Sequence, residues 1–590
     1  MKYALLSIAF LFSFTISAQN NMWETYFEKS GGVATPDYET TVNYCKALSD
    51  ASEMVRYTTF GVSPQGRLLP LLIIDKNGNF TPESVKASGN AILLLQAGIH
   101  PGEIDGKDAG LMFFRDLVIH EKFPGLLDGV TYLFIPIFSV DGHERSGPYN
   151  RINQDGPEEM GWRANALNLN LNRDYLKADA PETIAWLKLF REWLPDFFVD
   201  FHVTDGADYQ YVVTYALETN GNMDEGLTKW TENTFIPYME SEMEESGYPV
   251  FPYVMFRRWH DPRSGLRSSV SPPRLSQGYI ALQNRIGMLV ENHSLKDFKT
   301  RVYATYELYR IIAGVVTGEK DKLKELNRQA DQRIENEATG GYELPVDWEA
   351  GPDSVMVEFK GVEYDVVESD LTGGPWFKYY PDKPATFSVP LFNDLSPSKT
   401  VSLPYAYIIP HEWSEVIQRI VWHGIDYFKI DEPAEIEVET YRFKEPVWSN
   451  SPYEGRFRVS AEYEVDTEKI GFPVGSVVIP VNQRTARVIA HILEPDAPDS
   501  YLGWGFFNAI FEQKEYSETY VMEGIAREMI KKDPELLNKF EEWKENHPQA
   551  AQSQWAQLNW FYSKSPWWDF RKNLYPVGRI TDKKVLEDLQ

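Results

Sequence analysis

Cysteine is almost absent from this chain: Cys45 is the only one among 590 residues. A lone cysteine forms no internal disulfide and cannot build a zinc knuckle or ribbon, which needs several thiolates. Any metal site must therefore use histidine and carboxylate ligands. Basic residues are also scarce, because 58 lysines and arginines stand against 87 acids and give a formal net charge of -29. A charge of this sign repels phosphate backbones, so we expect no nucleic-acid partner.

Long apolar runs are missing as well, except at the start of the chain. There, Met1-Lys2 precedes an apolar run from Tyr3 to Ile16, which the small residues Ser17-Ala18 follow. This order is typical of a secretory signal peptide, and the run is shorter than the roughly 20 residues that span a bilayer. We expect residues 1–18 to be a signal peptide and the protein to be exported, to the periplasm or the extracellular space, without a membrane span.

The remaining composition, 43% hydrophobic and 25% charged, is that of a globular protein with ample material for a buried core. From about residue 90 to 310, short β-rich runs alternate with amphipathic stretches, which favours a sheet with helices packed on its faces. Pro181-Glu182-Thr183 opens a helix that extends through Trp193, since proline is tolerated in a first helical turn. The predicted strands are Ala91-Ile99, Val130-Phe138, Phe197-Val203, Tyr211-Leu217 and Gly287-His293.

A different pattern begins after the breaker sequence Thr339-Gly340-Gly341. Apolar and polar residues alternate from Phe457 to Val465, which is the signature of a strand with one buried face, and Ile436 and Val438 repeat it. The apolar residues from Trp413 to Val421 fall at helical spacing instead. The end of the chain is rich in aromatic residues and mostly helical in character.

We therefore divide the chain into three parts. Residues 1–18 form the signal peptide, residues 19–340 form an α/β domain, and residues 341–590 form a mixed accessory region, β-rich first and helical last. We expect this region to shape or cover a cleft of the α/β domain. Buried packing explains its many aromatic residues more often than a sugar-binding face does.

A histidine and a carboxylate stand together where the strand Ala91-Ile99 ends, in the turn His100-Pro101-Gly102-Glu103. Alone, this pattern is better explained by a surface turn or a hydrogen-bonded histidine than by a metal site. His202 lies at the far end of a strand that is otherwise built for burial, and Glu291 ends another. Such positions are costly for polar groups without a partner, and a catalytic zinc needs three protein ligands and one open position.

These residues belong to a series of short motifs that follow one another along the chain. The motifs are Gly66-Arg67, His100-Pro101-Gly102-Glu103, Val140-Asp141-Gly142, Trp162-Arg163, Leu171-Asn172-Arg173-Asp174, Pro181-Glu182-Thr183, Asp200-Phe201-His202 and Leu289-Val290-Glu291. In this order the chain resembles the zinc carboxypeptidase family, the carboxypeptidase A-like metallopeptidases, over about residues 40 to 315. The resemblance implies a mixed central sheet flanked by helices and the hydrolysis of peptides.

The resemblance also implies that His100, Glu103 and His202 hold one zinc ion, and that Glu291 activates the water on the metal. Zinc lowers the pKa of its water from 15.7 to about 7, so a nearby carboxylate can take the proton at neutral pH and later pass it to the leaving amine. Asp200 lies two residues earlier on the same strand face as His202, so it could orient nearby groups or could equally be a structural partner.

For the substrate, the resemblance implies three further residues. Arg163 would polarise the scissile carbonyl and stabilise the developing oxyanion. Asn172 and Arg173 would hold the free C-terminal carboxylate of a peptide, because a guanidinium matches a carboxylate in two parallel hydrogen bonds. Tyr279 is our candidate for the mobile tyrosine of the family, although its spacing to Glu291 is shorter than expected.

The chain departs from the family pattern at two places. Asn170 stands where the family commonly has an aspartate that supports the first zinc histidine, and a neutral amide would accept the imidazole N–H more weakly. The familiar Asn-Pro-Asp-Gly turn here reads Ser139-Val140-Asp141-Gly142. Neither change removes a proposed ligand.

Five arginines gather in an otherwise acidic chain: Arg257, Arg258, Arg263, Arg267 and Arg274. They could select substrates with acidic groups, or they could pair with surface acids, as charge runs usually do. Three more histidines lie near motifs, and we expect structural roles for them because three ligands are already assigned: His143, His260 and His293.

The sequence thus predicts an exported zinc metallopeptidase, most simply a metallocarboxypeptidase that releases C-terminal residues from a peptide substrate. One alternative is a zinc amidase or deacylase that acts on cell-wall peptides or acyl amino acids. The other is a catalytically silent protein that only binds peptides, against which the intact ligand set and Glu291 argue.

Overall fold

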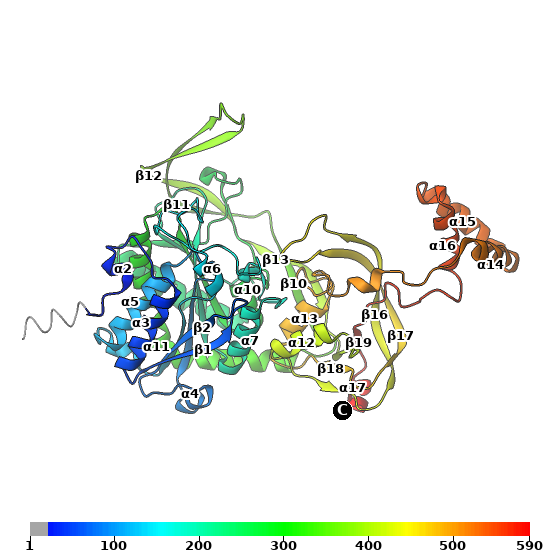
Figure 1. Ribbon diagram of the computed structural model, residues 1–590, viewed down its shortest axis with the longest axis horizontal. Coiled ribbons are helices and arrows are strands. Elements are labelled where there is room, and N and C mark those ends of the chain that lie inside the picture. Colours follow the sequence, from blue (N-terminus) through cyan, green and yellow to red (C-terminus); the bar gives the residue numbers. More distant parts are fainter. Residues whose placement is uncertain (1–21) are drawn as a thin grey trace, which may run out of the picture.

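The computed structural model describes residues 22–590. Figure 1 shows a main body built from the N-terminal half, a second body beside it, and a group of helices that projects from the second body. The predicted signal peptide, residues 1–18, lies outside the described residues. None of the helices in residues 22–590 is long and apolar enough to cross a membrane.

An eight-stranded mixed sheet forms the centre of the main body, in the order β1-β2-β4-β3-β5-β9-β6-β7. The inner strands β4, β3, β5 and β9 run parallel, and their neighbours β2 and β6 run antiparallel to them. Every strand predicted between residues 90 and 310 lies in this sheet, so the predicted α/β fold class is confirmed. The strands are β1 (Val55–Val62), β2 (Leu68–Ile74), β3 (Ala91–Ala97), β4 (Val130–Ile135), β5 (Phe197–Thr204), β6 (Val213–Leu217), β7 (Val250–Pro252) and β9 (Ile286–His293).

Both faces of the inner strands are buried, as their continuous apolar sequences require. Along β3, Leu93 and Leu95 pack in a core with α5 and α11, whereas Ile92 and Leu94 pack in another core with α7 and the C-terminal helix α13. The second core therefore continues into the accessory region. The helices of the main body are α2 (Tyr26–Lys29), α3 (Tyr38–Ala51), α4 (Pro82–Ser88), α5 (Asp105–Val118), α6 (Val140–Glu144), α7 (Pro181–Trp193), α8 (Glu225–Trp230), α9 (Ile236–Glu245), α10 (Ser276–Leu282) and α11 (Phe298–Glu337).

The long helix α11 ends just before the predicted domain boundary near residue 340. It has 40 residues, and Asp297 caps its start by accepting a hydrogen bond from the Thr300 amide. The chain returns to the main body after this boundary, because β12 (Pro375–Phe392) pairs with the short strand β8 (Leu266–Arg267). The boundary stays a prediction for this reason.

The accessory region is β-rich first and helical last. Strand β10 (Glu343–Ala350) pairs with β13 (Leu395–Ser402), and β11 (Val355–Glu368) pairs with β12 in a long hairpin at the top of Figure 1. A six-stranded sheet forms the second body, in the order β15-β18-β14-β19-β16-β17. Its strands are β14 (Ala406–Ile409), β15 (Phe428–Lys429), β16 (Ala434–Trp448), β17 (Val459–Phe472), β18 (Val477–Pro480) and β19 (Gly578–Ile580).

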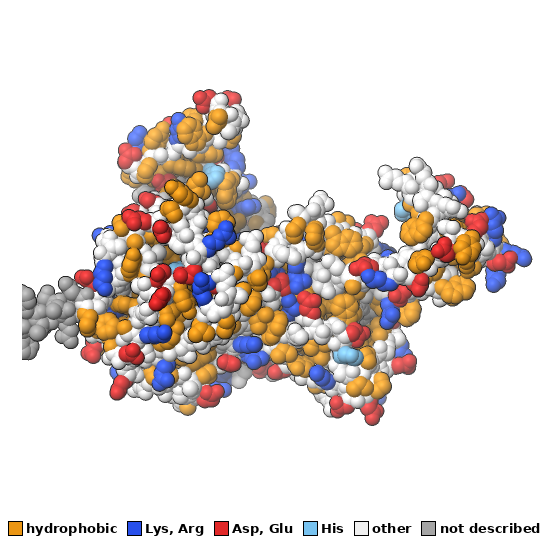
Figure 2. Space-filling model, in the orientation of Figure 1, with side chains coloured by type: hydrophobic (Ala, Val, Ile, Leu, Met, Phe, Trp, Pro, Cys, Tyr) orange, Lys and Arg blue, Asp and Glu red, His pale blue; other side chains and the backbone are white. Residues whose placement is uncertain are grey.

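The helices of this region divide into two groups. Helices α12 (Ser414–Trp422), α13 (Ala486–Leu493) and α17 (Lys583–Leu589) belong to the second body, and α12 coincides with the predicted helix. Helices α14 (Thr519–Lys532), α15 (Glu535–Asn546) and α16 (Gln554–Tyr562) form the projecting group with a small core of its own. Apolar side chains lie on the surface of this group in Figure 2, and Tyr520 and Trp555 are among the exposed ones.

Ion pairs join the two bodies around Asp179. This carboxylate accepts hydrogen bonds from Arg419 and Arg456 of the accessory region, at 2.6 and 2.7 Å, and from Lys177 at 3.2 Å. Lys177 and Arg419 are buried. The junction is therefore a charged cluster within the protein rather than a solvated linker.

His423 makes the same junction sensitive to acid. Its Nε2 donates to the Leu176 carbonyl (2.9 Å) and its Nδ1 accepts from the Tyr279 hydroxyl (2.8 Å), which requires the neutral ring. Burial lowers the pKa of His423 from 6.5 to about 4. The unfolded state therefore takes up this proton first, so the stabilisation is complete above pH 6.5 and is lost as the pH falls toward 4.

We expect the free energy of unfolding of the wild type to fall by about 3 kcal/mol relative to His423→Asn between pH 7 and pH 4. Asparagine has a donor and an acceptor but takes up no proton, and the other buried histidines titrate in both proteins. Urea unfolding at several pH values measures the difference. A difference that stays constant with pH would show that His423 is not responsible.

Candidate metal centre and substrate cavity

Three of the predicted site residues meet because neighbouring parallel strands end at the same edge of the sheet. His100 and Glu103 lie in the turn after β3, and His202 lies near the end of β5, which pairs with β3. Glu291 on β9 is the register partner of His202. Gly102 lets the turn pack closely, since a Cβ there would lie 2.7 Å from Cγ of Arg151.

The three candidate ligands converge on one point. Oε2 of Glu103 lies 3.0 Å from Nδ1 of His100 and 3.0 Å from Nδ1 of His202, and the two Nδ1 atoms are 3.2 Å apart. The side chains are almost fully buried, with exposed fractions of 4% for His100, 2% for Glu103 and 2% for His202. No other group of three such side chains in residues 22–590 brings its donor atoms together in this way.

The donor set fits zinc. The Nε2 atom of His100 donates to Oδ1 of Asn170 (2.9 Å), and Nε2 of His202 donates to Oδ2 of Asp200 (2.9 Å), which leaves both Nδ1 lone pairs free for a cation. Two imidazoles and one carboxylate form the ligand set of a catalytic zinc with an open position. The predicted zinc cofactor is thereby supported by the chemistry of the residues present.

The carboxylates around the three candidate ligands also favour a bound cation. Burial opposes the proton on both histidines and lowers the pKa of His100 to about 4, whereas the carboxylates of Asp200, Glu103 and Glu291 outweigh burial and raise the pKa of His202. Arg151 and Arg163 neutralise only the outer oxygen of Glu103, at 2.6 and 3.3 Å.

Glu291 faces the cavity beside the candidate ligands. Its Oε2 is buried and has no hydrogen-bond partner among the described residues. Burial, helped by Glu103 and Asp200, raises the pKa of Glu291 to about 8, against the opposing charge of His202. A carboxylate with an open oxygen in this position is ready to exchange a proton with a water molecule.

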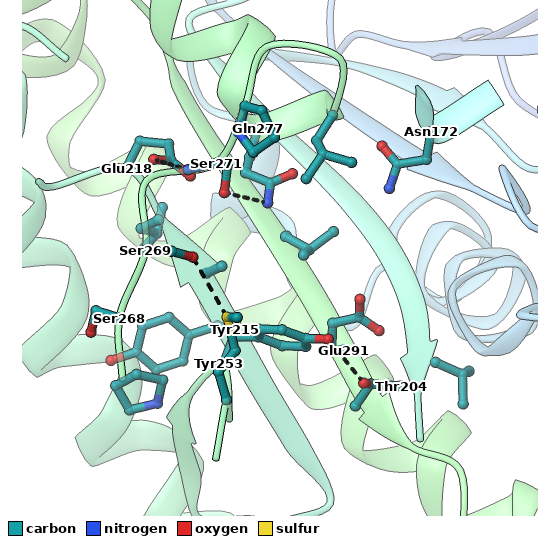
Figure 3. A pocket seen from close by; sticks show the side chains of 18 of the residues that line it. Asn172, Thr204, Tyr215, Glu218, Tyr253, Ser268, Ser269, Ser271, Gln277 and Glu291 are labelled. Atoms are coloured by element: carbon teal, nitrogen blue, oxygen red, sulfur yellow. Dashed lines mark hydrogen bonds between the residues drawn. The ribbon is translucent and has the colours of Figure 1, made fainter. Parts of the chain in front are cut away.

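The centre opens into a cavity of about 1300 Å³. The proposed substrate residues Arg163, Asn172 and Arg173 line this cavity together with Glu291, and Figure 3 shows Asn172 and Glu291 on its wall. Asn172 is held from behind, because its Oδ1 accepts a hydrogen bond from the Ser276 amide (3.0 Å). Arg173 donates to the Asn172 carbonyl (2.7 Å).

The accessory region reaches the site at two places. Asn393 and Asp394, in the loop between β12 and β13, line the cavity. Glu454 accepts a hydrogen bond from the backbone N–H of Asn170 (2.8 Å). The side-chain oxygen of Asn170 in turn accepts a hydrogen bond from His100. The expectation that this region shapes the cleft therefore agrees with the geometry.

Tyr279 does not join the site. Its side chain is fully buried, and its hydroxyl donates to His423 and accepts from Gln283 (2.7 Å) in the core below the sheet. We therefore withdraw it as a substrate contact. Tyr253 lines the cavity instead, with its hydroxyl 3.3 Å from Oγ1 of Thr204. It follows the short strand β7, and no sequence motif marks it.

The arginine cluster divides in the structure. Arg267 and Arg274 line the cavity, and Arg274 pairs with Asp499 at 2.7 Å. Arg267 is exposed and makes no ion pair with the described residues. The others lie away from the cavity and have partners: Arg258 with Asp261, Arg263 with Glu363, and Arg257 over the ring of Phe392.

The three additional histidines lie outside the metal centre. His143 contacts Lys107 and Glu144, each at 2.9 Å. His293 stacks on Tyr209, and His260 lies in the loop beneath the hairpin of β11 and β12, where its carbonyl accepts from Tyr379. Structural roles for the three histidines therefore stay a prediction, and neither ring nitrogen of His293 has a hydrogen-bond partner among the described residues.

Comparison with known proteins agrees with this geometry. Residues 41–234 match the family model described as zinc carboxypeptidase. Carboxypeptidase 2 of Trichophyton rubrum is 22% identical over 493 residues, which cover 81% of this chain and 85% of that protein, and Carboxypeptidase 2 of Trichophyton tonsurans gives the same values over 498 residues.

Among solved structures, carboxypeptidase A from Helicoverpa armigera is 15% identical and covers 51% of this chain and 81% of its own, with a TM-score of 0.37. The assignment rests on the family model and on the two Trichophyton relatives, and this structural likeness adds nothing to it. Residues 41–234 thus form a zinc carboxypeptidase domain, and the chain is a hydrolase of the metallocarboxypeptidase type.

Proposed function

We propose that this protein is an exported enzyme that releases the C-terminal residue of peptides by zinc-dependent hydrolysis. One observation carries the proposal: His100, Glu103 and His202 converge beside the open oxygen of Glu291, at a cavity that Asn172 and Arg173 also line. The candidate metal ligands, the proposed base and the residues proposed to hold a terminal carboxylate therefore meet at one cavity.

When bound, zinc supplies a Lewis acid that polarises a carbonyl oxygen and makes water acidic near neutral pH. Glu291 accepts the proton of the attacking water as the new C–O bond forms at the scissile carbonyl. It then gives this proton to the nitrogen of the breaking C–N bond, so that the products are a carboxylate and a free amino acid. Asp200 and Asn170 keep the histidine rings in the tautomer that presents Nδ1.

Arg163 and the pair of Asn172 and Arg173 act on the substrate. The Arg163 side chain is half exposed and borders Glu103, so its permanent charge can reach the oxyanion that develops on the carbonyl. The amide of Asn172 and the guanidinium of Arg173 hold the terminal carboxylate, and thereby fix which peptide bond lies at the metal.

A peptide panel with free and amidated C-termini tests the proposal. We expect the full-length zinc protein to release single residues from the free C-terminus, and to act at least 100-fold more slowly on amidated peptides, which offer no charge to Arg173. Mass spectrometry of the products measures both. Equal rates on both series would favour an amidase or an endopeptidase, and intact peptides throughout would favour a silent binding protein.

A further inference from the structure

The two carboxylate oxygens of Glu103 have different surroundings. Oε2 lies 3.0 Å from Nδ1 of His100 and 3.0 Å from Nδ1 of His202, at the point where the candidate ligands converge. Oε1 instead accepts hydrogen bonds from Arg151 (2.6 Å) and from Arg163 (3.3 Å). One oxygen is therefore directed to the metal, and the other is held by guanidinium groups.

Rotation of this carboxylate is restrained on both sides. The backbone N–H of Val203 donates to Oε2 (3.0 Å), while the Arg151 guanidinium donates to Oε1. Glu103 is only 2% exposed, so water does not readily replace either donor. Hydrogen bonds between ionised groups are short and strong, and the 2.6 Å contact with Arg151 is of this kind. The carboxylate is therefore fixed with only one oxygen available to the cation.

Arg151 is itself anchored on the turn that carries Glu103. Its side chain is 14% exposed and packs on Gly102, where a Cβ would lie 2.7 Å from Cγ and 2.9 Å from Cδ of the arginine. Its Nε donates to Oε1 of Gln154 (3.3 Å), whose amide group donates to the Gly102 carbonyl (2.9 Å). The arginine therefore has a fixed position beside the candidate metal ligand, which the partner in a solvated surface pair would lack.

Arg163 makes a different contact with the same oxygen. Its side chain is 49% exposed, and its 3.3 Å distance to Oε1 of Glu103 is longer than that of Arg151. An exposed guanidinium with a weak contact is free to turn to a substrate, as we propose for Arg163. Arg151 then remains on Glu103. The two arginines thus have separate tasks.

The number of Glu103 oxygens on the ion decides how much room the metal keeps. A carboxylate that binds through both oxygens occupies two positions, whereas one that binds through a single oxygen occupies one. The three donor atoms are 3.0, 3.0 and 3.2 Å apart, close to the roughly 3.3 Å expected between single-atom ligands of a tetrahedral zinc ion. Such a ligand set leaves one position for water and lets the ion accept a further oxygen from the substrate.

We propose that Arg151 is a positioning residue that makes Glu103 a one-oxygen ligand of zinc. The inference rests on the proposed function, because it concerns the metal of that reaction. Without the guanidinium, Oε1 loses its strongest partner and turns to the ion, which attracts it by charge. Glu103 then binds through both oxygens and occupies the place that the water or the scissile carbonyl needs. Hydrolysis slows although every ligand is still present.

Cobalt substitution tests the coordination directly. Co²⁺ in place of zinc absorbs visible light strongly when it has four ligands and several-fold more weakly when it has five. We expect the four-ligand spectrum for the full-length wild type and the weaker five-ligand spectrum for Arg151→Met. Arg151→Gln is a second variant, should the apolar side chain prevent folding, since glutamine is too short to hold Oε1. Arg163→Gln removes the weaker contact and keeps the wild-type spectrum.

Kinetics and metal content separate this inference from the proposed function. With zinc, we expect kcat of Arg151→Met to fall about 10- to 100-fold with little change in KM, because the site for the substrate carboxylate is untouched. An unchanged cobalt spectrum in both Arg151 variants, loss of the metal from them, or an equal spectral change in Arg163→Gln overturns the inference even if hydrolysis slows. A wild type that binds cobalt but cleaves no peptide rejects the proposed function, and the spectra then still decide the inference.

Discussion

Replacing Glu291 with glutamine lowers kcat for peptide hydrolysis by about 10,000-fold and leaves one zinc ion per chain, if the proposed mechanism holds. Glutamine fills the same space but cannot accept the proton of the attacking water. The metal ligands are untouched, because Glu291 contributes no donor atom to the cluster of His100, Glu103 and His202. Steady-state kinetics and metal analysis of the same preparation measure the two quantities.

Glu232→Gln is the matched control, because it removes an exposed acid from the same cavity wall. We expect its kcat to stay within about threefold of the wild type. Loss of zinc in Glu291→Gln would instead assign this carboxylate to the metal. Retained turnover would assign the proton transfer to another group.

The second large effect concerns stability, at the junction of the two bodies. We expect Asp179→Ala to lower the free energy of unfolding by about 3 kcal/mol, because it leaves the buried guanidinium of Arg419 without its main counter-charge. Chemical denaturation measures the loss. Glu415→Ala is the control: Glu415 contacts Arg419 and Arg456 but is exposed, so its removal costs less than about 1 kcal/mol.

The pH dependence of stability provides a second test of Asp179. Burial opposes its ionisation, but hydrogen bonds and charges from Arg456, Lys177 and Arg419 prevail and lower the pKa of Asp179 from 3.8 to about 2. The stabilisation is therefore present above pH 3.8 and is lost as the pH falls through 2. The difference between wild type and Asp179→Ala should shrink by about 2 kcal/mol over this interval. A constant difference would mean that packing, not charge, explains the loss.

The features predicted best were those that depend on the spacing of residues within one short segment. Strands that are buried on both faces read as continuous apolar runs, and His100, Glu103 and His202 stand out because polar groups end such runs. Parallel strands then deliver these side chains to one edge of the sheet. The α/β fold class followed from that logic, whereas the choice of His100, Glu103 and His202 as one ligand set came from the resemblance to the zinc carboxypeptidase family.

Contacts between segments that are distant in the sequence could not be predicted from local patterns. Asp394 and Glu218 line the cavity because β12 returns to β8 and because β6 ends there, and no local pattern records either event. Tyr279 failed for a related reason. Its helix, α10, packs under the sheet, so the side chain meets His423 of the accessory region rather than the substrate. A sequence distance to Glu291 carries no information about which face of a helix a residue occupies.

The hydrogen bond from the Asn170 amide to Glu454 has a practical meaning for anyone who shortens this enzyme. A fragment cut at residue 340 would keep every proposed ligand in its sequence and yet leave the loop behind His100 unsupported. The two bodies are in that sense a single unit, and substitutions in the turn around Glu454 would disturb the segment that contacts His100.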